Sequence, residues 1–451
     1  MRLPPRSLYR LFPLVARASR WSERRLTPGG RVVLGLVVAA ALFGIDMRQT
    51  LAWQAATLGS GLLLASLLAS LRWRARISVR RVLPQYACDG QPFAYFLEIT
   101  NHGAHTERDL VLAEQLHQPS LSWHDFRARR GQGRHLNVVD RAIGFPRWVE
   151  LRLRDRGAAM TPLPVPAMAA GASVRVTIEA TPLRRGWIDF EGVELLRPDP
   201  LGICRARLRV AAPGRVLALP RRHAVPALHL AARRHYQKGG VSLALAVGDS
   251  QEFAALRDYR QGDPRRHIHW RSFAKTGKLI VKEYQDEYFD RHALIIDTHV
   301  DPADEARFEA IIRVAASLAG GPRPRDSILD LIFAGREVVE LCAGRGLADT
   351  GRALAWLAEA RAAGAGDVDP VTDLIGTRAT GLASALVVLG GFDASREALL
   401  DTLATHGVRA AALIVTHDET ARPPHVGAGQ QRFTVRVAHL EGDLAALATL
   451  P

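Results

Sequence analysis

Apolar residues recur along the chain in three patterns, and each pattern predicts a different kind of structure. Two long apolar runs come first, Val32 to Ile45 and Leu51 to Leu71, and the second has the about 20 residues that a helix needs to cross a bilayer. From Ile77 to about Leu219, short alternating runs lie between Gly, Pro and Asn, which predicts a β-sandwich. From His292 onward, buried strands alternate with segments of helical spacing, which predicts an α/β domain with a doubly wound, mostly parallel sheet.

One segment interrupts the rhythm of the predicted sandwich. Gln118 to Arg147 is polar and lacks alternation, so we expect a long loop or insertion there. Trp123 and Trp148 lie near its ends. They are interpreted either as anchors of the loop or, more simply, as side chains packed in the sandwich.

Charge is concentrated beside the two apolar runs. The formal net charge is +15, of which residues 1 to 31 carry +7 and residues 72 to 81 carry +5, leaving +3 for residues 82 to 451. Because the basicity belongs to two short flanks, we expect no nucleic-acid partner. Arginines on both sides of two apolar runs predict a transmembrane hairpin over residues 32 to 71, with its ends in the cytoplasm and the turn Asp46 to Thr50 outside.

The basic leader has a helical pattern of its own. Leu8, Leu11, Phe12 and Val15 recur at helical spacing among arginines, which favours a helix that rests on anionic lipid, although Pro13 weakens the pattern. A cleaved signal peptide is the alternative interpretation of this region.

Cysteine usage argues against a stapled or metal-bound fold. Cys88, Cys204 and Cys342 are odd in number and far apart in sequence. We therefore expect reduced thiols, no disulfide framework and no cofactor.

Candidate functional residues gather in one segment. The chain has 56 arginines and only four lysines, yet Lys275, Lys278 and Lys282 fall within eight residues. Lysine is a compact point charge and arginine a planar fork, so retaining lysine here indicates positions where the fork does not fit. The predicted signature and interaction residues are Arg257, Asp258, Tyr259, Gly262, Asp263, Arg266, Trp270, Lys275, Lys278 and Lys282.

Two interpretations of this segment stay open. In the first, Asp263 caps a helix that begins at Pro264, and the basic turn that follows gathers a phosphate or an acidic protein surface. In the second, Arg257 and Arg266 pair internally with Asp258, Asp263 or Glu283, and Tyr259 and Trp270 are packing anchors. His267 and His269 share a face only on a strand, so a metal site there is a weaker idea.

A weak metal candidate follows the first strand of the α/β part. Asp297 and Asp301 stand where Asp-x-Ser-x-Ser would resemble the metal-ion-dependent adhesion site of von Willebrand factor type A domains. His299 and Asp301 replace both hydroxyl ligands, and Gly390 stands where a further Asp would be needed. The simpler interpretation is that Asp297 caps the loop that follows it.

The order of several motifs resembles bacterial membrane proteins of the domain-of-unknown-function family fifty-eight. The motifs are Arg184-Arg185-Gly186, Asp199-Pro200-Leu201-Gly202, Leu219-Pro220 and the long signature from Phe253 to Glu283. His269 and Phe273 depart from the more usual acidic or amide residue and small hydroxyl residue of that signature.

The resemblance implies a β-sandwich followed by a von Willebrand type A-like domain. It also implies a partnership with an AAA+ ATPase of the MoxR type, and association with transglutaminase-like membrane proteins. The implied process is the assembly or maturation of envelope complexes. It implies no known reaction.

Together these observations predict five segments: a basic cytoplasmic leader (1–31), a two-helix transmembrane hairpin (32–71), a β-sandwich (77–220), a joining signature segment (221–291) and a von Willebrand type A-like domain (292–451). We expect a non-enzymatic scaffold in the bacterial inner membrane, with its soluble domains in the cytoplasm. An anion- or phosphate-ligand protein or enzyme that uses Arg265, Arg266 and Lys278 is the alternative. Metal-dependent adhesion through Asp297 is the second alternative.

Overall fold

Three helices begin the chain in the computed structural model: α1 (Arg6–Arg25), α2 (Pro28–Phe43) and α3 (Thr50–Leu71). The structure describes residues 5–43, 50–129, 137, 140, 143–226, 252–263, 265–285, 290–321, 327–335, 338–342, 347–364, 366–421 and 430–447. The chain divides into two compact units. The first unit comprises Met1–His223, Val300–Gly320 and Ala353–Gly364, and the second comprises the remaining ranges.

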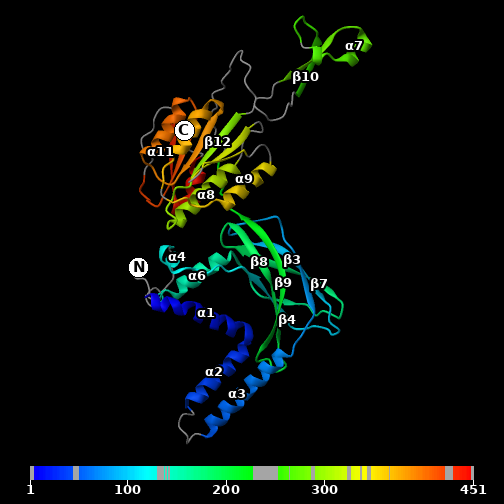
Figure 1. Cartoon of the computed structure of the whole chain (residues 1–451), viewed down its shortest axis with the longest axis vertical. Helices are drawn as coiled ribbons and strands as arrows, with labels where there is room; N and C mark the ends of the chain where they lie inside the picture. Colours follow the sequence, from blue (N-terminus) through cyan, green and yellow to red (C-terminus); the bar gives the residue numbers. More distant parts are fainter. Residues whose placement is uncertain are drawn as a thin grey trace. The chain divides into compact units, whose positions relative to one another are not determined.

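The helices α2 and α3 lie side by side (Figure 1). A Cβ at Gly59 of α3 would overlap Val37 of α2, so the absence of a side chain lets the helices approach closely. By length and composition, one helix among the described residues can cross a membrane, at Leu51–Leu71. The helix α2 is apolar but shorter, about 24 Å against a hydrocarbon core of about 30 Å. The predicted turn between them lies outside the described residues apart from Thr50.

Two sheets form the predicted β-sandwich. One sheet has the order β1-β3-β7-β5 and the other has the order β2-β9-β8-β4-β6, with all neighbours antiparallel except β2 and β9. Burial alternates along β3, so Tyr95, Leu97 and Ile99 point into the core between the sheets. The strands are β1 (Ile77–Val82), β2 (Tyr86–Cys88), β3 (Phe93–Asn101), β4 (Leu110–Leu116), β5 (Ala158–Ala159), β6 (Leu163–Val165), β7 (Ser173–Pro182), β8 (Gly186–Pro198) and β9 (Arg205–Leu219).

The predicted insertion contains helices where a loop was expected. Helix α4 (Trp123–Ala128) lies within it and α6 (Phe145–Arg156) begins at its end, while residues 130–136, 138–139 and 141–142 lie outside the described residues. Trp123 and Trp148 pack with Tyr9 and Phe12 of α1 in a separate aromatic cluster. The simpler interpretation, that both tryptophans pack in the sandwich, was therefore wrong, because α1 supplies a nearer apolar face.

The turn between β8 and β9 is hydrogen-bonded to the start of α2. This turn, residues 199–204, is called the tip below. The Asp199 carboxylate accepts backbone N–H bonds from Leu201, Ile203 and Cys204 at 2.8–3.1 Å, which fixes the turn. The Thr27 hydroxyl in turn donates to the Gly202 carbonyl at 2.5 Å and accepts from Gly30 N–H at 2.9 Å, so it caps α2 and ties it to the tip.

The tip also reaches α3. The Cys204 N–H donates to the Ser66 hydroxyl at 2.9 Å, and Ile203 and Cys204 pack against Leu63 and Leu67. The Asp199-Pro200-Leu201-Gly202 motif thus shapes the part of the sandwich that contacts both apolar helices.

The Arg184-Arg185-Gly186 motif joins the sandwich to α8 (Glu305–Ala319) and to the end of α9 (Leu347–Glu359). Arg185 forms an ion pair with Glu309 and donates to the Ala360 carbonyl at 2.8 Å. Trp187 donates to Glu359 at 2.6 Å. Both helices come after the first strand of the α/β part in the sequence. Nevertheless, Glu309 of α8 and Glu359 at the end of α9 bind side chains of the sandwich.

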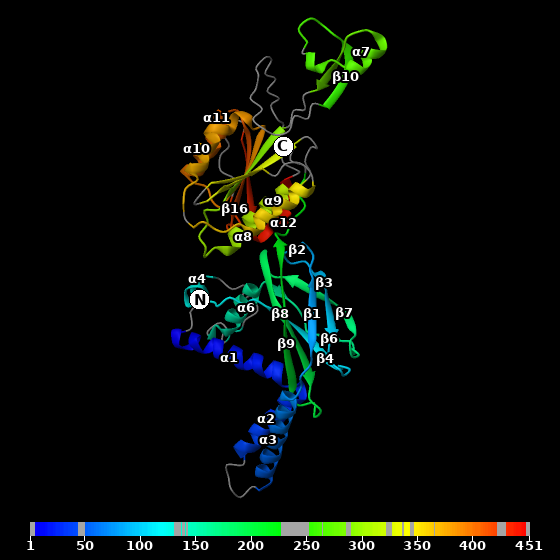
Figure 2. The same cartoon turned by 45° about the vertical axis from the view of Figure 1, so that its right-hand side comes forward.

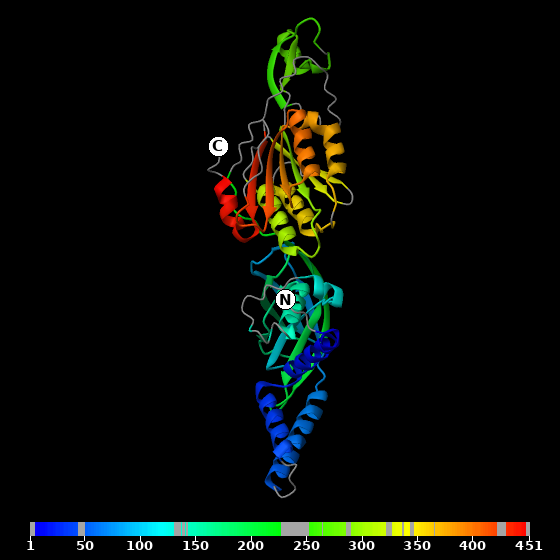
Figure 3. The same ribbon diagram turned by 90° about the vertical axis from the view of Figure 1, so that its left-hand side faces the viewer.

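The second unit contains the predicted mostly parallel sheet. Its order is β14-β13-β12-β15-β16-β17, and every pair is parallel except β13 with β14 (Figure 2). The strands are β12 (Asp290–Asp297), β13 (Ser327–Ala334), β14 (Val339–Cys342), β15 (Ser384–Leu389), β16 (Arg409–Thr416) and β17 (Gln430–Arg436). Helices α10 (Asp369–Arg378) and α11 (Ala394–Thr405) bury apolar residues on one face, and α12 (Leu440–Ala446) packs beside β17 (Figure 3). The boundaries of the five predicted segments stay predictions.

Gly30→Ala tests the attachment of α2 to the tip. A Cβ at Gly30 would overlap the Ile203 carbonyl oxygen, whereas one at Gly35, on the same helix, meets nothing within 4 Å. We expect Gly30→Ala to lower the free energy of unfolding by about 1–3 kcal/mol through overpacking. The measurement is the thermal midpoint of the detergent-solubilised full chain, with Gly35→Ala as the matched control. Equal midpoints for the two variants would show that the close approach is unimportant.

Candidate functional site

The strand order of the parallel sheet marks a place where ligands bind in this class of fold. Numbered along the chain, the six strands follow the order 3-2-1-4-5-6, so the order reverses between β12 and β15. In open α/β sheets, ligands bind beyond the carboxyl ends of the strands at such a switch point. Asp297 ends β12, and Gly390 directly follows β15. The candidate metal ligand Asp297 therefore lies at the switch point, where this class of fold binds its ligands.

A buried arginine occupies the surroundings of Asp297. The Asp297 side chain is 0% exposed, and Arg396 Nε donates to Asp297 Oδ2 at 2.8 Å. The backbone N–H of Gly390 donates to the same oxygen at 3.2 Å, and that of His299 donates to Oδ1 at 2.9 Å. Three donors and one full positive charge thus compensate a carboxylate that has no access to water.

Arg396 is held in place by the start of its own helix. Asp393 caps α11 by accepting the Arg396 N–H at 3.0 Å, and it also pairs with the Arg396 guanidinium. Burial acts to lower the pKa of Arg396, but Asp297 and Asp393 outweigh it and raise the pKa above its ordinary value. The guanidinium therefore stays charged.

This arrangement bears directly on the predicted metal site. A divalent cation at Asp297 would have to displace Arg396, because the guanidinium already balances the carboxylate charge. Asp301 is exposed and accepts the Ala303 N–H at 2.8 Å. Among the described residues, no three His, Cys, Asp or Glu side chains gather to hold a metal ion. The structure favours the simpler interpretation, in which Asp297 caps the loop that follows it and forms a structural ion pair.

The sequence reasoning missed Arg396. Its signal was an arginine in the first turn of a helix, three residues after the capping Asp393, in the segment that follows the strand beside β12. That signal becomes readable only when the pairing of β12 with β15 is known. His299 lies close by, where a Cβ on Gly366 would come within 2.5 Å of its ring, so the imidazole is packed against backbone.

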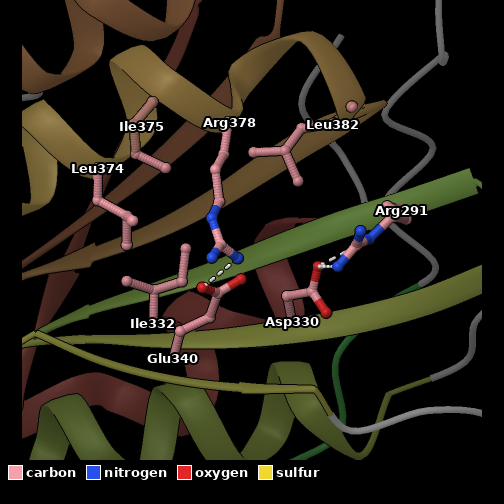
Figure 4. A pocket seen from close by; sticks show the side chains of 9 residues that line it. Arg291, Asp330, Ile332, Glu340, Leu374, Ile375, Arg378 and Leu382 are labelled. Atoms are coloured by element: carbon pink, nitrogen blue, oxygen red, sulfur yellow. Dashed lines mark hydrogen bonds and ion pairs between the residues drawn. The ribbon is translucent and has the colours of Figure 1, made fainter. Parts of the chain in front are cut away.

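A small cavity lies elsewhere in the second unit, between β13, β14 and α10. Its volume is about 40 Å³, and its lining includes two ion pairs, Arg378 with Glu340 at 2.5 Å and Arg291 with Asp330 at 2.8 Å (Figure 4). A volume of this size admits about three water molecules between the side chains. Both arginines are already paired, so the cavity is not a candidate anion site.

The signature residues form a small module, called the arm below, which runs from Glu252 to Gln285. Strands β10 (Glu252–Asp258) and β11 (Ile280–Gln285) pair antiparallel, and between them lie a short 3-10 turn (Arg265–His267) and α7 (Trp270–Thr276). Ile268 and Val281 form a bridge and are buried, so the connection folds back onto β11.

An ion pair closes the base of the arm's connection. Arg257 donates to both oxygens of Asp263, at 2.7 and 2.8 Å, and the Arg260 N–H donates to Asp263 at 2.8 Å. The Asp263 carboxylate is thus turned to Arg257 and Arg260, while the predicted cap of a helix that begins at Pro264 stays a prediction. Pro264 and the side chain of Glu283 lie outside the described residues. The predicted internal pairing is present for Arg257 with Asp263, whereas Arg266 contacts His267.

The outer surface of the arm combines apolar and basic side chains. Trp270 is 60% exposed and packs edge to face on Phe273, which is also exposed. From residue 264 to residue 282 the sequence has six basic residues and no acidic one. Lys275 and Lys278 are exposed near the end of α7, while Lys282 and Tyr259 are half-buried on the strand side. Gly262 and Gly277 adopt positive φ at the two turns.

Comparisons with known proteins leave the family of this chain open. No protein-family model matches the chain, and no curated protein matches it.

Solved structures give distant matches. The CARDB domain of a Pyrococcus furiosus protein is 8% identical, with 32% of this chain and 93% of that chain covered and a TM-score of 0.17. An aerotolerance-related membrane protein from Bacteroides fragilis is 12% identical, with coverage of 31% and 73% and a TM-score of 0.24. A human PapD-like domain is 14% identical, with coverage of 32% and 85% and a TM-score of 0.17. These TM-scores are too low to assign a fold by similarity. The fold is therefore described from the strand order and register given above.

Replacing Arg396 tests the buried ion pair. We expect Arg396→Met to lower the free energy of unfolding by about 3–5 kcal/mol, because it strands the Asp297 carboxylate in the interior. Asp297→Asn in the same chain should recover much of that loss, as a double-mutant cycle in chemical denaturation would measure. Arg409→Met, at an exposed position of β16, is the control. Losses that simply add in the double variant would contradict the pairing.

The arm's ion pair predicts a titration at low pH. Hydrogen bonds from Arg257 and from the Arg260 backbone lower the pKa of Asp263 from 3.8 to about 2. A lowered pKa means that the pair stabilises the arm above pH 4 and that this contribution is lost as the pH falls through about 2. The carboxyl ¹³C signal that disappears in Asp263→Asn should titrate near pH 2. It should titrate at a higher pH in Arg257→Gln, although still below 3.8 because Arg260 continues to lower the pKa, and a wild-type midpoint near 3.8 would refute the pairing.

Proposed function

We propose that the chain is a membrane-anchored, non-enzymatic scaffold that docks a protein partner through its arm. The partner is an AAA+ ATPase of the MoxR type, and the process is the assembly or maturation of envelope protein complexes. A transglutaminase-like membrane protein is a further partner in this proposal. The observation that carries the proposal is the exposed apolar and basic surface of the arm, on a module held together by the Arg257–Asp263 pair.

The anchor consists of α2 and α3. Only α3 meets the length for a span by itself, but the two helices lie side by side and both are apolar. A two-span hairpin is supported by the arginine-rich flanks, which favour the cytoplasm for both ends. The soluble parts then lie in the cytoplasm, against the inner membrane of a bacterium, where ATP and AAA+ ATPases are found.

The surface chemistry of the arm fits a protein partner. Exposed Trp270, Phe273 and Leu279 provide the large apolar anchors that dominate binding energy at protein interfaces. The surrounding lysines and arginines select an acidic partner surface and speed its encounter. Their spread over exposed positions of the arm favours a macromolecule over a small anion. The choice of a MoxR-type ATPase rests on the family resemblance of the motifs.

The α/β domain supports a docking role that needs no metal. Its strand order, with one antiparallel edge strand, is consistent with a von Willebrand type A-like domain. Its switch point holds Arg396 in contact with Asp297. In this proposal the domain is a preformed support for the arm.

Aromatic truncation tests the docking surface. We expect the double variant Trp270→Ala with Phe273→Ala to lower recovery of the AAA+ ATPase about tenfold or more, because hot-spot aromatics each contribute about 2 kcal/mol or more. The measurement is quantitative mass spectrometry of tagged full-length protein purified from gently solubilised native membranes. Tyr86→Ala with Phe96→Ala, which removes two exposed aromatics from the sandwich, is the matched control.

The basic residues are tested in the same assay. Arg266→Ala with Lys278→Ala should weaken recovery more at low than at high salt, because screening already removes part of the attraction. Unchanged recovery in both arm variants would reduce the arm to a structural element. Absence of any AAA+ ATPase from the wild-type sample would overturn the choice of partner.

A further inference from the structure

We propose that α1 lies in the headgroup layer of the membrane and binds anionic phospholipid through its arginines. This inference rests on the proposed membrane anchoring by α2 and α3. It adds a second membrane contact, one that selects for lipid charge, beside the apolar helices α2 and α3.

Helix α1 has apolar residues on two sides, and the fold covers only one of them. Tyr9 and Phe12 are buried against Phe126, Trp148 and Leu151. The exposed side chains are Leu11 (50%), Leu14 (56%), Val15 (52%) and Trp21 (51%). At 100° per residue, Leu11, Leu14 and Trp21 lie roughly opposite the buried pair, and Val15 lies between the two faces, about 60° from Phe12. A soluble helix needs one apolar face, so the second face requires a separate explanation.

The arginines of α1 divide into two groups. Arg24 reaches the fully buried carboxylate of Glu194 at 3.0 Å, and Arg20 donates to Gln118 at 2.7 Å, so both serve the fold. The second group makes no ion pair within the described part of the chain: Arg6, Arg10, Arg17 and Arg25. Arg10 and Arg17 are seven residues apart, so they lie on one side of the helix, beside the exposed apolar face. An apolar face bordered by arginines is the pattern of helices that lie in a membrane interface.

The end of α1 is fixed at the level of the last turns of α3. The helix ends at Arg25, Leu26 is extended, and Thr27 begins the cap of α2, so α1 turns away from the direction of α2 (Figure 2). Leu26 also bridges to Cys204 of the tip, whose N–H binds Ser66, five residues before the end of α3. If α3 crosses the bilayer, this level is where hydrocarbon gives way to headgroups.

Anionic lipid is the occupant that fits both the charge and the position. A second copy of the chain could cover the apolar face only by bringing the same arginines together, and like charges would oppose that contact. A bilayer with anionic headgroups satisfies both features, and it is already present beside α2 and α3. Each arginine near such a surface contributes about a fivefold preference at low salt.

The test measures the lipid selectivity of the full-length protein in reconstituted membranes. The readout is the association of spin-labelled phosphatidylglycerol relative to spin-labelled phosphatidylcholine. We expect wild type to prefer phosphatidylglycerol, and the variant with Arg6, Arg10, Arg17 and Arg25 each changed to Gln to lose about fivefold or more of that preference. The matched control, with Arg108, Arg175 and Arg215 of the sandwich and Arg409 of β16 changed to Gln, removes the same charge at exposed positions and should keep the preference.

A second readout places the helix. Brominated phosphatidylglycerol should quench wild-type tryptophan fluorescence more strongly than that of Trp21→Phe, because Trp21 then lies among the acyl chains near the headgroups.

Retention of the protein in membranes after alkaline washing separates the proposed anchor from the proposed role of α1. Extraction by the wash would overturn the anchor and this inference together. Retention with unchanged selectivity and equal quenching would overturn only the role of α1. Protein dimerisation that protects Trp21 from the lipid would assign the face to a second copy instead.

Discussion

Compensation of buried carboxylates by arginine is the constraint on which the arrangement of this chain depends. Glu194 and Asp297 are both inaccessible to water, and an uncompensated charge at either place would destabilise the fold by several kcal/mol. Each is paired with an arginine from a helix, Arg24 of α1 and Arg396 of α11. Arg396 pairs with Asp297 and Asp393 at once, because the planar guanidinium can serve two acceptors, and it thereby fixes α11 relative to β12. Arg24 reaches one oxygen of Glu194, and Arg207 of β9 donates to the other. The preference for arginine over lysine in this chain thereby has a structural reason.

Local periodicity was enough to predict the two kinds of sheet. Alternation along β3 and the apolar run of β12 each record which faces are buried, and that information is contained in a few neighbouring residues. The partners of Asp297 and Arg185 could not be predicted, because Arg396 and Glu309 are 99 and 124 positions away and become neighbours only through the fold. Composition was enough to locate the arm in the sequence. It did not predict the contacts of Asp263, because the carboxylate could accept either from the helix expected after it or from an arginine.

The tip shows why a turn motif of the sandwich matters to the two apolar helices. Asp199 binds three backbone N–H groups, so the turn keeps one shape regardless of what it touches. That shape presents the Ile203 carbonyl to the Thr27 hydroxyl and the Cys204 N–H to the Ser66 hydroxyl. The sandwich thus contributes hydrogen bonds to polar groups of two mostly apolar helices. Beside hydrocarbon such bonds would count for more, because no water could replace them.

The continuity of the arm with the central strand has a mechanical consequence. Only residues 286–289 separate the end of β11 from the start of β12, and β12 is hydrogen-bonded on both sides, to β13 and β15. A pull on this end of the arm therefore reaches the sheet at the first residue of β12. A pull directed along β12 would load the hydrogen bonds to both parallel neighbours in shear, so that none could be opened one at a time. In the proposed docking role, the sheet would resist such a load as one unit.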